Sequence, residues 1–239
     1  MLQQLWAARC SWDEPIPVEL LEMWRYYHRQ LPEIENVSIP RWTQSGHHSL
    51  HQELHGFSDA STKAYAAVVY LRVIAVDGTI TVTLLAAKSK VAPIKTMTVP
   101  RLELSAALLL ARLLHFICTS LDLDAKTTPI HCRTDSRITL AWLSRAPAYW
   151  KTFVANRVAE IKTLLPNAIW HHVSTNKNPA DCVSRGISPE ELASNTLWWS
   201  GPSWLAKPEE HWPTSDQHLP PVTALEERSR HAVVHTTTA

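Results

Sequence analysis

Four carboxylic side chains stand at the ends of largely apolar segments, and this feature most constrains the fold of the chain. The segment over 54–59 alternates in the manner of a strand and ends at an aspartate. A turn over 60–63 and a second strand over 65–73, rich in β-branched and aromatic residues, are predicted to follow. Isolated buried charges are costly, so such acids are expected to share a compensating partner. The four acids are Asp59, Glu103, Asp135 and Asp181.

The order of the remaining segments predicts a mixed sheet. Asp77-Gly78 is a hairpin signal that precedes a third strand over 79–87. The later elements expected are an apolar helix over 101–120, a strand over 130–135, helices over 136–144 and 152–165, a strand over 169–173 and a short helix from 178. Three antiparallel strands followed by alternating helix and strand predict an α/β fold, with a mixed five-stranded sheet and helices on both faces.

The placement of the four acids in this fold favours a metal site. Glu103 falls in the first turn of the apolar helix, on its inward face. The helix N-terminus offers a carboxylate only about 0.3–1 kcal/mol, so a divalent cation is the better partner. Asp59 and Asp135 each end a strand, and neighbouring strand ends bring such residues together. Asp181 follows Asn-Pro and serves equally well as a helix cap. Each acid alone is compatible with a structural role, but together they favour a hard cation with oxygen ligands.

Composition excludes several other classes of protein. The chain has 239 residues, 45% of them hydrophobic, which is enough to bury a full core. A formal net charge of +1 means that nucleic-acid binding would need a local basic patch. The four cysteines lack C-x-x-C spacing, which indicates reduced thiols in an intracellular compartment. No apolar run reaches membrane-spanning length, the longest covering 64–71, and none of the five glycines forms a phosphate-binding loop.

The first 53 residues are predicted to form an appendage. One amphipathic helix is expected between Pro17 and Pro32, followed by an extended linker over 39–42. Four histidines follow at partly helical spacing, but without an acidic or cysteine partner they favour a solvated loop over a metal site. They are His47, His48, His51 and His55.

Four regions of the chain carry a family resemblance. They are HGFSDASTKAYAAVVYLR (55–72), KSKVAPIKTMTVPRLEL (88–104), TDSRITLAWL (134–143) with TFVANRVAEI (152–161), and NPADCVSRG (178–186). In order, spacing and flanking residues they resemble the ribonuclease H domain of LTR-retrotransposon polyproteins, specifically of the BEL/Pao group. WDEPIP (12–17) and SIPRW (38–42) resemble the segment after reverse transcriptase, and LWWSGPSWL (197–205) resembles the connector toward the integrase.

The resemblance implies a domain layout. Residues 1–53 would be a helical connector from the reverse transcriptase side, and 54–187 the ribonuclease H-like domain. Residues 188–213 would form the connector toward the integrase, and 214–239 a disordered tail.

The resemblance also implies an activity, namely metal-dependent cutting of the RNA strand of RNA–DNA hybrids during reverse transcription. The four acids would be both catalytic residues and metal ligands. Two Mg²⁺ ions about 4 Å apart, for which Mn²⁺ would substitute, would activate a water and stabilise the leaving oxygen. The implied partners are the hybrid and the reverse transcriptase and integrase parts of the same polyprotein, with no membrane. The expected location is intracellular, in a cytoplasmic particle or the nucleus.

Two groups of residues are candidates for substrate contact. Backbone groups near Ser58, Ala60 and Ser61 are placed to read the ribose 2′-OH, although turn geometry alone explains these small residues equally well. A basic, proline-broken loop over 88–95 precedes the apolar helix and is a candidate for phosphate binding, with an ordinary solvated loop as the alternative. The phosphate-binding candidates are Lys88, Lys90, Lys95 and Arg101, with Ser136, Arg137 and Arg157 as further candidates.

The chain departs from the family pattern in two places. Retroviral and cellular relatives carry a mobile histidine before the fourth acid, where this chain has 174–177, so either turnover is slow or Asn176 or Lys177 substitutes. The basic protrusion of some cellular enzymes is replaced by the short segment 145–151. Three alternatives stay open: a catalytically weak or domesticated nucleic-acid-binding module, a purely structural or interaction protein, and a polynucleotidyl transferase using Glu160 as its third acid.

Overall fold

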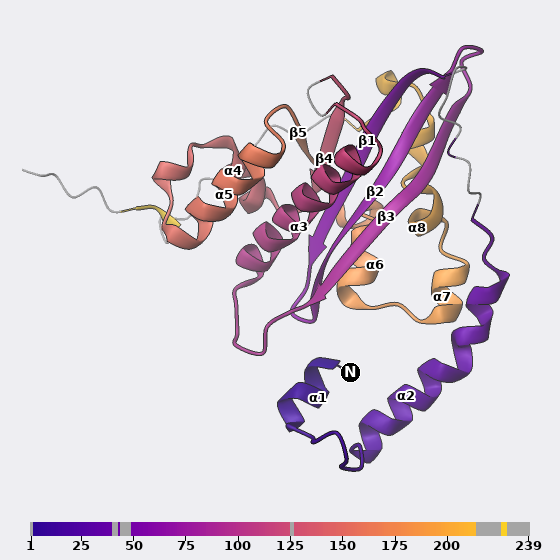
Figure 1. Cartoon of the computed structure of the whole chain (residues 1–239), viewed down its shortest axis with the longest axis vertical. Helices are drawn as coiled ribbons and strands as arrows, with labels where there is room; N and C mark the ends of the chain where they lie inside the picture. Colours follow the sequence, from indigo (N-terminus) through magenta and orange to yellow (C-terminus); the bar gives the residue numbers. More distant parts are fainter. Residues whose placement is uncertain (1, 40–42, 44–48, 125–126, 214–225, 229–239) are drawn as a thin grey trace, which may run out of the picture.

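A five-stranded sheet with the strand order β3-β2-β1-β4-β5 forms the centre of the molecule (Figure 1). The computed structural model describes residues 2–39, 43, 49–124, 127–213 and 226–228. β1 pairs antiparallel with β2, and β2 with β3, whereas β1–β4 and β4–β5 are parallel pairs. The mixed sheet confirms the predicted fold class. The strands are β1 (Ser49–Ala60), β2 (Ala64–Ala75), β3 (Ile80–Val91), β4 (Ile130–Thr134) and β5 (Ile169–His172).

Helices cover both faces of this sheet, as predicted (Figure 1). One face packs against α3 (Val99–Ser120), α4 (Arg137–Ser144) and α5 (Thr152–Leu164), and this side holds the larger apolar core. The other face packs against α6 (Ala180–Arg185), α8 (Thr196–Ser200) and the 3₁₀ helix η4 (Ser203–Ala206). Tryptophans 198 and 204 belong to this second core.

The long helix α3 lies directly on β1. Gly56 makes this approach possible, because a Cβ atom at this position would lie 2.6 Å from Leu110 Cδ1 and 3.1 Å from Leu114 Cδ1. α3 is long and apolar enough to cross a membrane, which corrects the expectation that no segment reaches that length. However, 72% of its most apolar window is buried inside the protein, as in the core helix of a soluble domain.

The N-terminal region contains more structure than the single helix predicted. It forms α1 (Leu2–Ala8), α2 (Val18–Gln30) and the 3₁₀ helix η1 (Leu31–Asn36). From α1, Gln3 Nε2 donates a hydrogen bond to the carbonyl oxygen of Ala92, 3.1 Å away, beyond the end of β3. β1 begins at Ser49, five residues before the predicted start of the domain.

The segment over 188–213 folds against the sheet and does not extend away from it. It contains α7 (Pro189–Ala193), α8, η4 and the 3₁₀ helix η5 (Glu209–His211). Tyr70 Oη donates to the carbonyl oxygen of Trp198 over 2.6 Å, and Arg72 Nε donates to that of Leu205 over 2.9 Å. Both donors are buried on β2, so the segment completes the second core.

Two local predictions are wrong. Lys88 and Lys90 belong to β3, where they pair with Ala67 and Tyr65 of β2, so the loop begins only after Val91. Ladder hydrogen bonds to β2 therefore override the loop-like composition. His51 and His55 belong to β1 and not to a solvated loop, and His55 is fully buried. The other calls in these regions, the linker over 40–42, His47, His48 and the tail over 214–225 and 229–239, lie outside the described residues.

Candidate metal centre and nucleic-acid interface

Three of the four predicted acids converge. One carboxylate oxygen each from Asp59, Glu103 and Asp135 lies within 4.8 Å of the other two. Asp59 and Asp135 are brought together by the parallel register of β1 and β4, which pairs Ser58 with Thr134 and so places the next residues side by side. Glu103 reaches them from α3, as the fifth residue of a helix that begins at Val99 and carries Pro100 in its first turn, so it lies just beyond the predicted first turn.

Burial and mutual repulsion both disfavour the charged forms of these acids. Burial raises the pKa of Glu103 to about 9, and the charges of Asp59 and Asp135 add to this. Burial also raises the pKa of Asp59 to about 7. The hydrogen bond from Ser184 opposes this rise, whereas the charge of Asp135 adds to it. Glu103 Oε2 is buried and has no hydrogen-bond partner among the described residues. An acceptor oxygen of this kind beside two further carboxylates fits a divalent cation with oxygen ligands.

Two hydroxyl groups orient the carboxylates, and neither was predicted. Ser184 Oγ donates a short hydrogen bond to Asp59 Oδ2, and Thr175 Oγ1 donates to Asp135 Oδ2 over 2.6 Å. Ser184 stands three residues after Asp181 in α6, but its partner Asp59 lies in β1, so no local pattern in the sequence indicates the contact. Thr175 lies in the loop over 174–177, in which Asn176 and Lys177 were the expected candidates.

Asp181, the fourth predicted acid, lies outside the group of three. It stands in the first turn of α6, and its Oδ1 accepts a hydrogen bond from Arg185 Nε over 2.6 Å. Its charge nevertheless contributes to the raised pKa values of Asp59 and Glu103, which places it close to the site. Its role as a ligand at the rim stays a prediction.

The small residues around Asp59 offer little surface to a substrate. Ser58 is fully buried in the central strand, and its carbonyl oxygen accepts a hydrogen bond from Asn178 Nδ2 over 3.0 Å. Ser61 Oγ donates to the carbonyl oxygen of Ser184 over 2.5 Å and accepts from the backbone N–H of Lys63 over 3.0 Å. Ala60 is buried as well. Their side chains hold the turn and the strand, which supports the alternative that turn geometry explains these residues.

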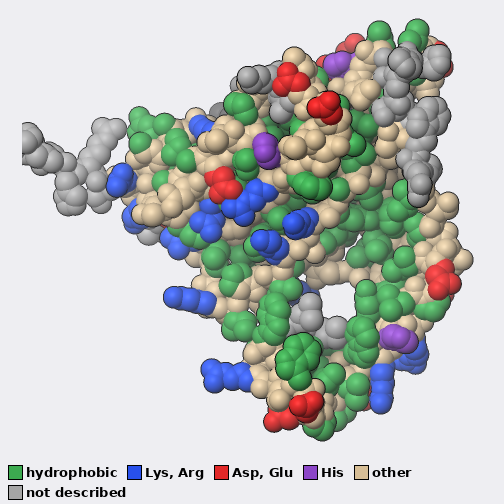
Figure 2. Space-filling model, in the orientation of Figure 1, with side chains coloured by type: hydrophobic (Ala, Val, Ile, Leu, Met, Phe, Trp, Pro, Cys, Tyr) green, Lys and Arg blue, Asp and Glu red, His purple; other side chains and the backbone are tan. Residues whose placement is uncertain are grey.

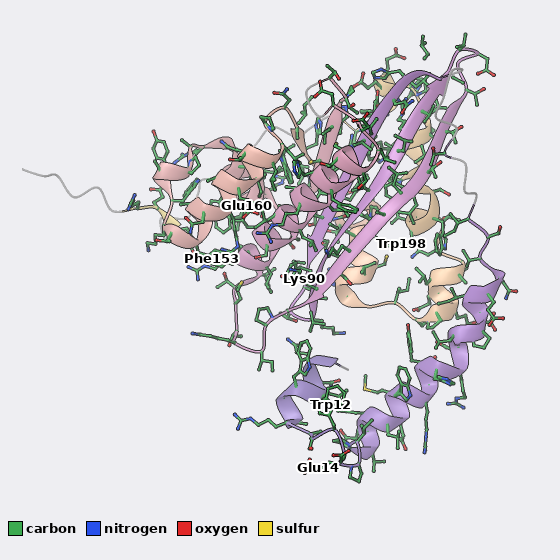
Figure 3. The ribbon with its side chains drawn as sticks, in the orientation of Figure 1. Trp12, Glu14, Lys90, Phe153, Glu160 and Trp198 are labelled. Carbon is green, nitrogen blue, oxygen red and sulfur yellow. The ribbon has the colours of Figure 1, made fainter. Side chains whose placement is uncertain are left out.

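The predicted basic residues fall into two sets. Lys88, Lys90 and Lys95 are exposed along the end of β3 and the loop before α3, and Figure 3 shows Lys90 beside the start of α3. Figure 2 shows Lys and Arg side chains gathered on this side of the molecule. Arg101 and Arg157 are partly buried and engaged, since both guanidinium groups lie near the ring of Phe153.

The two remaining candidates lie at the start of α4. Ser136 caps this helix, because its Oγ accepts a hydrogen bond from the backbone N–H of Thr139 over 3.2 Å. Arg137 follows it and is exposed. The Ser136 hydroxyl is therefore engaged in the helix cap.

Glu160, the acid required by a transferase, lies elsewhere. Its two carboxylate oxygens accept hydrogen bonds from Arg112 Nε and Nη2 over 2.6 and 3.0 Å, on the surface between α3 and α5. This engagement outside the acidic group argues against the transferase alternative.

A second set of buried charged residues, which the sequence did not reveal, lies on the opposite face of the sheet from α3. His55 Nε2 donates to Glu53 Oε2, and Arg133 Nη1 donates to His55 Nδ1, each over 2.8 Å. This assignment follows because arginine only donates and a carboxylate only accepts. Arg72 Nη1 completes the chain at 3.1 Å from Glu53 Oε2, and the ring of Trp212 covers it. Charges here are compensated, unlike those of the acidic group.

Comparisons with known proteins give distant structural similarities. The N-terminal RNase H domain from Mycobacterium tuberculosis is 16% identical with a TM-score of 0.39, over 61% of this chain and 97% of that one. RNase H1 from Halobacterium salinarum is 15% identical with a TM-score of 0.35, over 61% and 99%. Prototype foamy virus protease-reverse transcriptase is 15% identical with a TM-score of 0.28, over 66% of this chain and 22% of that one.

A family model gives the assignment. Among curated proteins, no relative matches. The family described as the Pao retrotransposon-like RNaseH-like domain matches residues 1–136, which include Asp59, Glu103 and Asp135. This span is more than half of the 239 residues and confirms the resemblance seen in the sequence motifs. The chain therefore belongs to the Pao retrotransposon-like RNaseH-like domain family.

Proposed function

We propose that this chain is a metal-dependent ribonuclease H that hydrolyses the RNA strand of RNA–DNA hybrids. The observation that carries the proposal is the convergence of Asp59, Glu103 and Asp135 within 4.8 Å, with a buried carboxylate oxygen of Glu103 that lacks a partner among the described residues. Three like charges held together at the ends of core elements are unfavourable without a cation. Membership of an RNase H-like family supports the same reading.

The proposed ligands are these three carboxylates, with Asp181 as a fourth. Bound Mg²⁺ ions, or Mn²⁺ in their place, would activate a water and stabilise the charge on the leaving oxygen. Ser184 and Thr175 would keep the ligand carboxylates of Asp59 and Asp135 in one orientation through their hydrogen bonds. Because the water is the nucleophile, no side-chain nucleophile is required.

The proposed substrate surface lies beside this site. Lys88, Lys90 and Lys95 are exposed next to α3 and would contact phosphates of the hybrid. We further propose that the domain acts within a polyprotein that carries reverse transcriptase and integrase, in an intracellular particle or the nucleus.

A nucleic-acid-binding module with weak or no catalysis is the second candidate. It is favoured by the fact that oxygens of Asp59, Asp135 and Asp181 already accept hydrogen bonds from Ser184, Thr175 and Arg185. A cation would have to share these acids with the hydroxyl groups and replace Arg185 on Asp181.

A cleavage assay distinguishes the two candidates. The full chain is incubated with a hybrid labelled on its RNA strand, in Mg²⁺, in Mn²⁺ and in EDTA. The nuclease predicts RNA fragments with either metal and none in EDTA, with single-stranded RNA and duplex DNA left intact. A chain that binds the hybrid but leaves its RNA intact in both metals would establish the binding module instead.

A further inference from the structure

The short segment over 226–228, near the C-terminus, lies against the start of α5, which is distant from it in the sequence. The backbone N–H of Lys151 donates to the carbonyl oxygen of Glu226, and that of Arg228 donates to Tyr149, each over 2.9 Å. Trp150 and Glu227 form an antiparallel bridge between these two bonds. The segment is thus held through its backbone beside the turn that precedes α5.

The two glutamates of this segment meet arginines. Glu226 Oε1 accepts from Arg101 Nε over 2.7 Å, and the Glu226 side chain is only 12% exposed. Glu227 Oε1 lies 3.2 Å from Arg145 Nη1 in a more exposed pair. Arg101 is one of the residues predicted from the sequence to contact phosphate. Its guanidinium group instead binds the carboxylate of Glu226 from the same chain.

Two arginines meet at the ring of Phe153, and one of them, Arg101, also binds Glu226. The guanidinium carbons of Arg101 and Arg157 lie 4.9 and 3.5 Å from the ring centre of Phe153, which Figure 3 shows at the start of α5. Arg157 Nε and Glu226 Oε2 are both buried without a hydrogen-bond partner among the described residues. A phosphate group, with more acceptor oxygens, is a better match to two guanidinium groups than one carboxylate.

We propose that Arg101, at the start of α3, binds a backbone phosphate of the hybrid, and that Glu226 and Glu227 compete with this phosphate in cis by pairing with Arg101 and Arg145. This inference rests on the proposed function. Arg101 stands two residues before Glu103 on α3, so a phosphate bound there lies at the same helix end as the metal site. Hybrid binding then requires the acidic segment to leave, which lowers the apparent affinity.

Binding of the full chain to a fluorescent RNA–DNA hybrid, measured by anisotropy in EDTA over a range of salt concentrations, tests this competition. Glu226→Gln combined with Glu227→Gln removes two negative charges and keeps the size of both side chains. We expect the hybrid to bind at least about threefold more tightly, because apparent affinity rises with the fraction of open sites. The salt dependence should steepen by about one phosphate contact.

Two further variants make the test specific. Glu209→Gln with Glu210→Gln changes the net charge equally near the opposite face of the sheet, where both residues line a pocket with Arg133 and Trp212, and should leave the affinity near that of the wild type. Adding Arg101→Gln to the Glu226 and Glu227 changes should abolish the gain. Equal tightening by both glutamine pairs, or a gain that persists without Arg101, would overturn the inference while leaving the proposed function intact. A folded chain that binds no hybrid in any variant would contradict both.

Discussion

At the scale of single residues, the partners of a buried charge decide its protonation state. Burial raises the pKa of Glu103 to about 9, because its charged neighbours are carboxylates. Burial alone would also raise the pKa of Glu53, but the hydrogen bond and charge of His55 and the charge of Arg72 lower it to about 2. Glu53 lies in β1 and Glu103 in the helix that packs on it. Glu53 is paired with Arg72, whereas the charged neighbours of Glu103 are carboxylates, so only Glu103 favours a bound cation. The acidic group is therefore the functional candidate, and the Glu53 group is structural.

Two buried histidines and one half-buried histidine should make part of the stability sensitive to acid. Burial is the main cause that lowers the pKa of His55 to about 3 and those of His131 and His171 to about 4, from an ordinary value of 6.5. Below pH 6.5 the unfolded chain takes up protons at these three positions that the folded chain does not, so the contribution of the histidines to stability is fully present above this pH and is lost as pH falls toward 4. We expect a slope of about 1.4 kcal/mol per pH unit for each proton taken up.

Urea unfolding at a series of pH values measures this slope. His171→Gln should reduce it by about one proton. The same pH dependence of unfolding in His171→Gln as in the wild type, between pH 6.5 and 5, would contradict the assignment of His171 as neutral in the folded state.

At the scale of elements, the contact between α3 and β1 sets the position of Glu103. The contact has no spare room at Gly56, where an added Cβ atom would lie 2.6 Å from Leu110 Cδ1. Leu110 is fully buried, so it has little freedom to move away. The metal site and the core packing are thus linked through one helix.

Gly56→Ala should destabilise the fold by about 1–3 kcal/mol through overpacking. Leu110→Ala alone should cost about 2–5 kcal/mol. The double variant should lose less than the sum, because the smaller side chain at 110 makes room for the new methyl group. Additive losses in chemical denaturation would show that the two positions do not share this contact.

Local patterns in the sequence predict the elements and the three converging acids, but not the partners of the acids. Asp59 and Asp135 are recognisable because each follows an apolar strand, and Glu103 because it interrupts an apolar helix face. Ser184, Thr175 and Glu226 are not recognisable in this way, since their roles depend on contacts between distant segments. The same reason explains Lys88 and Lys90, whose place in β3 is set by pairing with β2.

At the scale of the whole molecule, the central strands β1, β2 and β4 are buried between two layers, and the segment over 188–213 supplies part of the second layer. Leu205 is fully buried there, and its carbonyl oxygen accepts a hydrogen bond from buried Arg72. A connector that only joins two domains would not contribute such contacts. This part of the chain therefore belongs to the folded unit.

Leu205→Ala should cost about 2–5 kcal/mol in the free energy of unfolding, as for other large-to-small changes in a core. Leu50, which is 71% exposed in β1, offers the matched control, and Leu50→Ala should stay within about 0.5 kcal/mol of the wild type. Equal, small effects of both changes would mean that the segment is detachable.

The most direct test of the central claim compares cutting and binding in the Asp135→Asn variant. Asparagine keeps the size of the side chain and one acceptor oxygen but removes the charge needed to hold a divalent cation. We expect cleavage of a labelled RNA–DNA hybrid in Mg²⁺ to fall by about 100-fold or more, at least as much as for loss of a residue that only orients a ligand. Hybrid affinity in EDTA and the thermal midpoint should stay close to the wild type. A folded Asp135→Asn protein that cuts RNA at the wild-type rate would contradict the assignment of the carboxylate group as the catalytic centre.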